Sequence, residues 1–157
     1  MPGATFAIKQ AVDESGAKQQ QREQRTHEAQ QGARNVRGMP VGIDDAHYFR
    51  THNLHKAMAD VVADDCVVLL SHTPEPYRQA AHAGVDLMLS GHTHGGQVCL
   101  PGGFPILTDT PTPRAYVRGA WRYHAMAGYT SVGCGASVVD VRLNCLPELT
   151  LHQLRRA

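Results

Sequence analysis

Three histidines follow two short apolar segments, and together they could hold a metal ion. His72 lies in a Ser-His-Thr-Pro segment, directly after an apolar run that ends at Leu70. His92 and His94 lie in a Gly-His-Thr-His-Gly-Gly segment, shortly after a second apolar run that ends at Leu89. Neutral imidazole is a common ligand for zinc, iron, manganese and similar ions. The pattern therefore predicts a partial metal shell, and the neighbouring glycines would let the backbone approach the ion closely.

The two segments do not carry equal weight. A single histidine at a strand end is more often a hydrogen-bonded surface residue than a ligand, and a bare His-x-His pair also occurs by chance. The Gly-His-Thr-His-Gly-Gly segment is more specific because it follows an apolar strand, and the Ser-His-Thr-Pro segment one helix earlier adds to it. Four polar residues are candidates for hydrogen-bonding to the ligands, although loop carboxylates are more often turn formers: Asp44, Asp45, Ser71 and Thr93.

The apolar pattern predicts the elements that position the histidines. Residues 41–43, 66–70 and 85–89 are short apolar runs, as in buried strands. Between them, residues 54–62 have apolar side chains at the spacing of one helical face, and residues 74–83 are typical of a helix. Strand, helix, strand in this order favours a parallel α/β layer. Because the carboxyl ends of parallel strands meet at one crevice, we expect the three histidines to lie close together.

After residue 94 the sequence predicts a mainly β structure without an internal repeat. Glycines and prolines divide this part into turns, and strand candidates lie between them at 98–100, 116–117 and 129–132. Residues 148–154 alternate polar and apolar side chains, as in a strand with one face on the core.

Residues 1–38 differ in composition from residues 39–157. They are rich in glutamine and mixed charges and have almost no large apolar side chains after Val12. Such a segment buries too little surface to offset its ordering entropy. We therefore predict a disordered or loosely helical N-terminal arm, with an exposed interaction helix as the alternative, and a globular part from residue 39 onward.

Composition excludes several classes of function. The net charge is +1, which gives no electrostatic signal for nucleic acid or an anionic membrane. No run of about 18 apolar residues is present, so the sequence contains no candidate transmembrane segment, and no secretory signal is visible. The four cysteines form no Cys-x-x-Cys pair, so a reducing, cytoplasmic location is the default. Cys66 and Cys99 lie in apolar runs and are predicted to behave as small hydrophobic residues.

The histidine segments resemble those of the calcineurin-like metallophosphoesterases, in the bacterial branch of YaeI-like and YkoQ-like phosphoesterases. The resemblance rests on Leu-Ser-His-Thr-Pro at 70–74 and on Asp-Leu-Met-Leu-Ser-Gly-His-Thr-His-Gly-Gly-Gln at 86–97. It extends from Val-Gly-Ile-Asp-Asp at 41–45 to Pro-Glu-Leu-Thr-Leu at 147–151. It thus covers most of this chain but only the C-terminal half of the family domain.

This resemblance implies a four-layer α/β/β/α sandwich with two divalent ions, such as Mn, Fe or Zn, at the strand ends. His72 and His92 would bind one ion and His94 the other. The ions would generate the nucleophile and stabilise charge on a phosphomonoester or phosphodiester substrate. No residue of this chain is assigned as the catalytic acid or base.

The sequence also departs from the family pattern. It has no Gly-Asp pair and no Gly-Asn-His, which in the family supply a bridging carboxylate, a ligand and a catalytic histidine. Asp45-Ala46-His47 has the family's Asp-x-His form, but too few residues separate it from His72 for the missing motifs to fit, which favours a turn or helix cap. The expectation is an incomplete phosphoesterase. The alternatives are an inactive metal-binding remnant, or a half that needs a partner chain to cover its exposed sheet edge. Membrane association of a full-length relative stays open.

Overall fold

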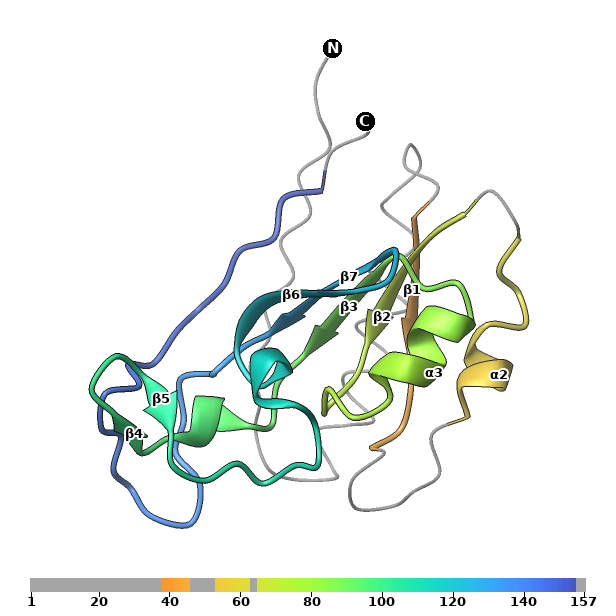
Figure 1. The fold of residues 1–157 in the computed structure, drawn as a ribbon. Coiled ribbons are helices and arrows are strands. Elements are labelled where there is room, and N and C mark those ends of the chain that lie inside the picture. The colour runs from red at the N-terminus through yellow and green to blue at the C-terminus, as the bar shows by residue number, and fades with distance from the viewer. Residues whose placement is uncertain (1–37, 46–52, 63–64, 155–157) are drawn as a thin grey trace.

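The computed structural model describes residues 38–45, 53–62 and 65–154 (Figure 1). Its main feature is a five-stranded sheet with the spatial order β1-β2-β3-β7-β6. The first four strands in this order are parallel to their neighbours, and β6 is antiparallel to β7. The strands are β1 (Gly38–Gly42), β2 (Cys66–Leu70), β3 (Leu87–Ser90), β7 (Met126–Thr130) and β6 (Gly119–Tyr123).

Consecutive apolar side chains place β2 and β3 inside the sheet. Val67, Val68 and Leu69 of β2 are buried, and so are Met88 and Leu89 of β3. A strand that is covered on both faces needs such an uninterrupted run. All three predicted strands of this layer are confirmed, although β1 begins three residues earlier than predicted and β3 begins two residues later.

The two helices are shorter than predicted. Helix α2 (Leu54–Ala57) gives way to tighter turns, because the N–H of Ala59 bonds to the carbonyl of Lys56 at 3.2 Å, three residues back. Helix α3 (Tyr77–His82) follows a turn at residues 74–76, where two prolines flank Glu75. Proline has no N–H to donate, so this turn precedes the regular helix.

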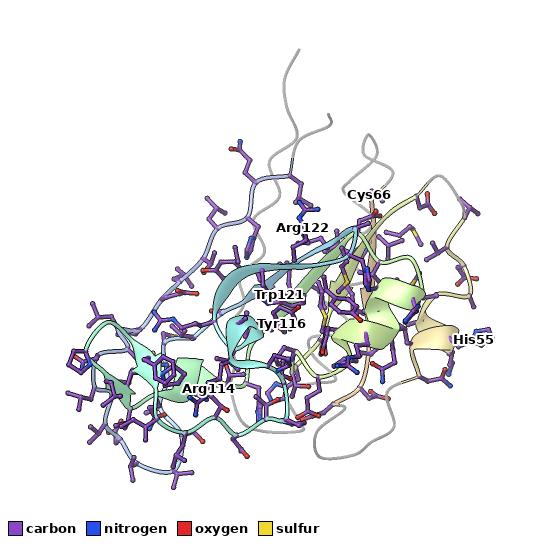
Figure 2. All side chains as sticks on the ribbon, viewed as in Figure 1. His55, Cys66, Arg114, Tyr116, Trp121 and Arg122 are labelled. Carbon is purple, nitrogen blue, oxygen red and sulfur yellow. The ribbon has the colours of Figure 1, made fainter. Side chains whose placement is uncertain are left out.

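The core lies between the helices and the sheet. Leu54 of α2 and Tyr77 of α3 belong to one cluster with buried side chains from all five strands. The Trp121 ring, labelled in Figure 2, occupies the space that a side chain at Gly128 would need. Its indole N–H donates to the Thr130 hydroxyl at 2.9 Å, so the antiparallel edge of the sheet is fixed by both packing and a hydrogen bond.

The part of the chain after β3 is less regular than predicted. Strands β4 (Cys99–Leu100) and β5 (Phe104–Pro105) form a separate antiparallel pair. The predicted strand at 116–117 is wrong: Arg114–Tyr116 form a 3₁₀ turn, η2, because the Tyr116 N–H bonds to the Pro113 carbonyl at 2.8 Å. Strand β6 was not predicted.

The predicted strand at 148–154 is also wrong. Leu149 and Leu151 are 70% and 67% exposed, and Figure 1 draws the segment as an extended coil without a strand arrow. Alternating polarity is not sufficient for a strand, because a ladder also needs a run of backbone pairs. The described residues give this segment one such bond, from the Glu148 N–H to the Gly133 carbonyl at 2.9 Å, and no ladder. The segment is tied instead by its polar side chains, as when the Tyr129 hydroxyl donates to Glu148 at 2.9 Å.

The mixed sheet with its helices confirms the α/β class. Apart from Gly38, which begins β1, the predicted arm at residues 1–38 lies outside the described residues. Among the helices that the structure describes, none has the length and apolar character needed to cross a membrane.

Candidate metal centre

His72 and His92 are brought together by adjacent parallel strands. Leu70 at the end of β2 pairs with Leu89 near the end of β3, and each histidine follows within three residues. The His72 carbonyl accepts the Gly91 N–H at 3.0 Å, which continues the pairing beyond the strands. His72 Nε2 then lies 3.0 Å from His92 Nδ1, with ring centroids 4.8 Å apart.

A backbone carbonyl fixes the ring orientation of His92. His92 Nε2 lies 3.3 Å from the Asp109 carbonyl oxygen. A carbonyl can only accept, so Nε2–H is the donor of this bond, and in a neutral ring this leaves the lone pair of Nδ1 facing His72 Nε2. If two nitrogens each lie about 2.1 Å from one ion, and the angle between the two bonds at the ion is a right angle, the nitrogens are about 3.0 Å apart. The facing pair of imidazoles therefore fits two ligands of one divalent ion.

A carboxylate that follows β1, the strand beside β2, lies near the ring nitrogen of His72 that faces His92. Asp45 follows β1, its side chain is only 12% exposed, and its Oδ2 lies 3.7 Å from His72 Nε2. Asp45, His72 and His92 thus follow the ends of β1, β2 and β3. Asp44, the other acidic candidate of this segment, is exposed. Within the described ranges, no group of three or more His, Cys, Asp or Glu side chains is arranged to hold a metal ion. His47 of the Asp-x-His segment lies outside those ranges.

His94 contacts an arginine. Its Nδ1 lies 3.5 Å from Nη2 of Arg142. The same guanidinium donates to the carbonyls of Val132 at 2.5 Å, Gly135 at 2.8 Å and Cys145 at 3.2 Å. Arg142 therefore joins the His94 turn to two later segments of the chain. Sequence reasoning did not identify this role, because residue 142 lies in an irregular segment 48 residues from His94.

The turn that carries the histidines has an unusual backbone. His92 and His94 have φ values of +67° and +48°, in the left-handed region that side chains rarely adopt. Gly95 also has a positive φ, and a Cβ on it would lie 3.0 Å from Cys145 Sγ. Such strain persists only where the surrounding structure enforces it, and it is common at functional sites.

The hydroxyls that were candidates for hydrogen-bonding to the ligands contact the backbone. The Ser71 hydroxyl donates to the Thr73 carbonyl at 2.7 Å. The Thr93 hydroxyl donates to the Val117 carbonyl at 2.6 Å and accepts the Gly95 N–H at 3.2 Å. These side chains stabilise the loops that carry His72 and His92, and so they act on the rings through the backbone.

Two buried thiols support the same turn. Cys145 Sγ donates to the His94 carbonyl at 3.2 Å, and Cys99 Sγ donates to the Gly95 carbonyl at 3.3 Å. Burial raises the pKa of the Cys99 thiol, and the neighbouring Cys145 raises it further. Cys99 thus matches its prediction as a small buried residue. Cys66 is exposed, contrary to its prediction, because it is the first residue of β2 and lies at the N-terminal end of this inner strand, where Figure 2 labels it.

This difference predicts the thiol reactivity of the folded protein. We expect an aromatic disulfide reagent at pH 8 to label Cys134 quickly and Cys66 more slowly. Both thiols are exposed, but burial and the nearby Asp86 raise the pKa of Cys66. Cys99 and Cys145 should react only after denaturant is added. Peptide mass spectrometry after timed quenching measures each site. Labelling of Cys145 at the rate of Cys134 in the native protein would contradict the buried position of the turn.

Sequence comparisons place this chain beside metallophosphoesterases. It is 35% identical over 88 residues to the uncharacterized metallophosphoesterase YkuE of Bacillus subtilis, which covers 56% of this chain and 30% of that protein. It is 27% identical over 148 residues to the uncharacterized metallophosphoesterase YkoQ of the same organism, covering 94% and 53%. It is 36% identical over 90 residues to the phosphodiesterase YaeI of Escherichia coli, covering 55% and 32%.

The chain therefore spans about half, or less, of the length of these curated relatives. No family model matches the sequence. No solved structure matches it either.

Proposed function

We propose that this chain supplies histidine ligands of a metal-dependent phosphoesterase site. The proposal builds on the homology of the chain to the C-terminal region of the calcineurin-like metallophosphoesterases. The observation that carries the proposal is the pair of facing nitrogens, His72 Nε2 and His92 Nδ1, 3.0 Å apart at the ends of neighbouring parallel strands. His94 is the third ligand in this proposal, toward a second ion. The described sheet would then form part of a four-layer sandwich.

Each residue of the site has a distinct task. His72 and His92 direct ring nitrogens to one point, and the carboxylate of Asp45 lowers the electrostatic cost of a cation there. The Asp109 carbonyl keeps the Nδ1 lone pair of His92 pointed inward. For His94 to bind a metal through Nδ1, Arg142 must move away from that nitrogen. When bound, divalent ions such as Mn, Fe or Zn supply Lewis-acid activation of water and of the phosphoryl group.

The substrate class follows from the same relatives. One of them is a phosphodiesterase by name, so we propose phosphodiesters or phosphomonoesters as substrates. The sequence has no Gly-Asp and no Gly-Asn-His segment, and we propose that the remaining ligands and the catalytic acid or base come from outside residues 39–157.

Hydrolysis of bis-p-nitrophenyl phosphate by residues 1–157 with added Mn²⁺ tests this function. Any turnover should be slow, because residues 39–157 lack the remaining ligands, and it should disappear with a chelator and in His92→Ala, which lacks one of the two facing nitrogens. His82→Ala is the matched control, since His82 is exposed on α3. Equal turnover by the wild type and His92→Ala would contradict the proposed ligand.

A second candidate function is metal binding without turnover. The sequence favours it in one respect, because it has no Gly-Asp and no Gly-Asn-His segment to supply the bridging carboxylate and the catalytic histidine. Calorimetric binding of Mn²⁺ without hydrolysis would support this alternative. Turnover that appears only when a chain carrying the missing motifs is added would instead support a half that needs a partner.

A further inference from the structure

Residues 106–113 form a strap that passes beside the two facing histidines. The strap connects β5 with the 3₁₀ turn η2, which precedes β6 (Figure 1). It begins where the Ile106 N–H donates to the Val98 carbonyl at 3.4 Å. Beyond its other end, the Val117 carbonyl accepts the Thr93 hydroxyl at 2.6 Å, one residue from His92. Both ends are therefore attached to the segment that carries the histidines.

The middle of the strap contacts the loops of both histidines. The Asp109 carbonyl lies 3.3 Å from His92 Nε2. The next residue, Thr110, donates its hydroxyl to Oε1 of Glu75 at 3.3 Å, and Glu75 is three residues beyond His72. One residue of the strap thus holds the His92 ring, and its neighbour holds the loop that follows β2.

The strap has little freedom to adopt another shape. The Thr110 hydroxyl lies 2.8 Å from the Thr112 hydroxyl and also accepts the Thr112 N–H at 3.2 Å. Thr112 is buried, and the prolines at 111 and 113 on either side of it restrict φ. Thr110 is therefore the point at which the internal bonds of the strap and its bond to Glu75 meet.

We propose that Thr110 and Glu75 are positioning residues, which hold the Asp109 carbonyl against His92 so that the Nδ1 lone pair faces His72. This inference deepens the function proposed above, because that lone pair is the one that would bind the metal. The acting group is the backbone carbonyl of Asp109, since its carboxylate is 80% exposed and lies 3.9 Å from His92 Nε2. A hydrogen-bond acceptor behind a ligating histidine typically contributes 10-fold to 100-fold to metal affinity.

Three variants separate the possible contributions. Thr110→Val removes the hydroxyl with little change in volume, Thr110→Ser retains it, and Asp109→Ala removes the carboxylate but leaves the carbonyl. We expect Thr110→Val to weaken Mn²⁺ binding, measured by calorimetry, about 10-fold. Thr110→Ser and Asp109→Ala should bind Mn²⁺ within about twofold of the wild type, because the first keeps the hydroxyl and the second keeps the backbone carbonyl. Glu75→Ala breaks the same bond from the other loop and should weaken binding as Thr110→Val does.

A spectroscopic measurement on the metal-free protein tests the same contact. A ring N–H that donates to a carbonyl exchanges slowly with water, so His92 Nε2–H should give a proton signal in nitrogen-labelled protein. We expect this signal in the wild type, Thr110→Ser and Asp109→Ala, and its loss in Thr110→Val. Thermal unfolding of each variant shows that it is folded, because a folding defect would lower the midpoint as well.

The outcomes are distinct from those of the proposed function. If the wild type binds no Mn²⁺, the proposed function fails, and the ring signal alone decides whether the strap positions His92. Absence of that signal in the wild type, or its persistence in Thr110→Val, would overturn the inference. So would a loss of affinity in Asp109→Ala equal to that in Thr110→Val, because the carboxylate would then be the acting group.

Discussion

Replacement of Gly95 by alanine is expected to lower the free energy of unfolding by about 2–5 kcal/mol. One part of this loss comes from the backbone, because φ at Gly95 is +62° and a left-handed conformation costs an alanine about 1–2 kcal/mol. The other part comes from packing. An added Cβ would lie 2.5 Å from Val132 Cγ1 and 3.0 Å from Cys145 Sγ, and overpacking of this kind costs about 1–3 kcal/mol.

Gly84→Ala is the matched control for this prediction. Gly84 has a φ of +84°, but no heavy atom lies within 4 Å of the position that its Cβ would take. It should therefore lose only the backbone part, about 1–2 kcal/mol. Urea unfolding of the three proteins measures the difference. Equal losses in the two variants would show that the space beside Gly95 is not closed by Val132 and Cys145.

The central layer of the fold could be predicted because its signals are local. Strand β2 is an uninterrupted apolar run, and such a run requires neighbours on both faces. Once two parallel strands are expected side by side, the residues just after them must meet. The contact between His72 and His92 follows from that topology.

The supporting residues could not be predicted because their signals are not local. Asp109 acts through its carbonyl, which every residue possesses, and Arg142 lies among turns with no periodic pattern. The alternation of polar and apolar side chains at 148–154 would suit one face of a strand. No described strand pairs with this segment, so it is extended but forms no ladder. The pattern thus predicted that His72 and His92 meet, but not which groups fix the orientation of their rings.

Replacement of Arg142 by alanine is expected to lower the free energy of unfolding by about 3 kcal/mol. The guanidinium donates to the carbonyls of Val132, Gly135 and Cys145, and each acceptor left without its donor in a buried place costs about 1–3 kcal/mol. The contacts to Val132 and Cys145 are partly buried and the contact to Gly135 is exposed. Water therefore replaces some of the lost bonds, and the total stays in the lower half of the range for two buried acceptors.

The Arg142 contacts also predict a hierarchy among variants. Arg142→Lys should recover only part of the loss, because an ammonium group cannot reproduce the planar arrangement of donors that serves several carbonyls at once. Arg122→Ala is the control, since Arg122 is exposed, is labelled in Figure 2 and donates to a single carbonyl, that of Ala125 at 3.2 Å. Its loss should stay below about 0.5 kcal/mol.

If Arg142→Ala unfolds at the urea concentration of Arg122→Ala, the guanidinium does not hold the His94 turn to the later segments. If Arg142→Ala is destabilised as expected and also exposes Cys145 to thiol reagent, the turn that carries His94 depends on this one side chain.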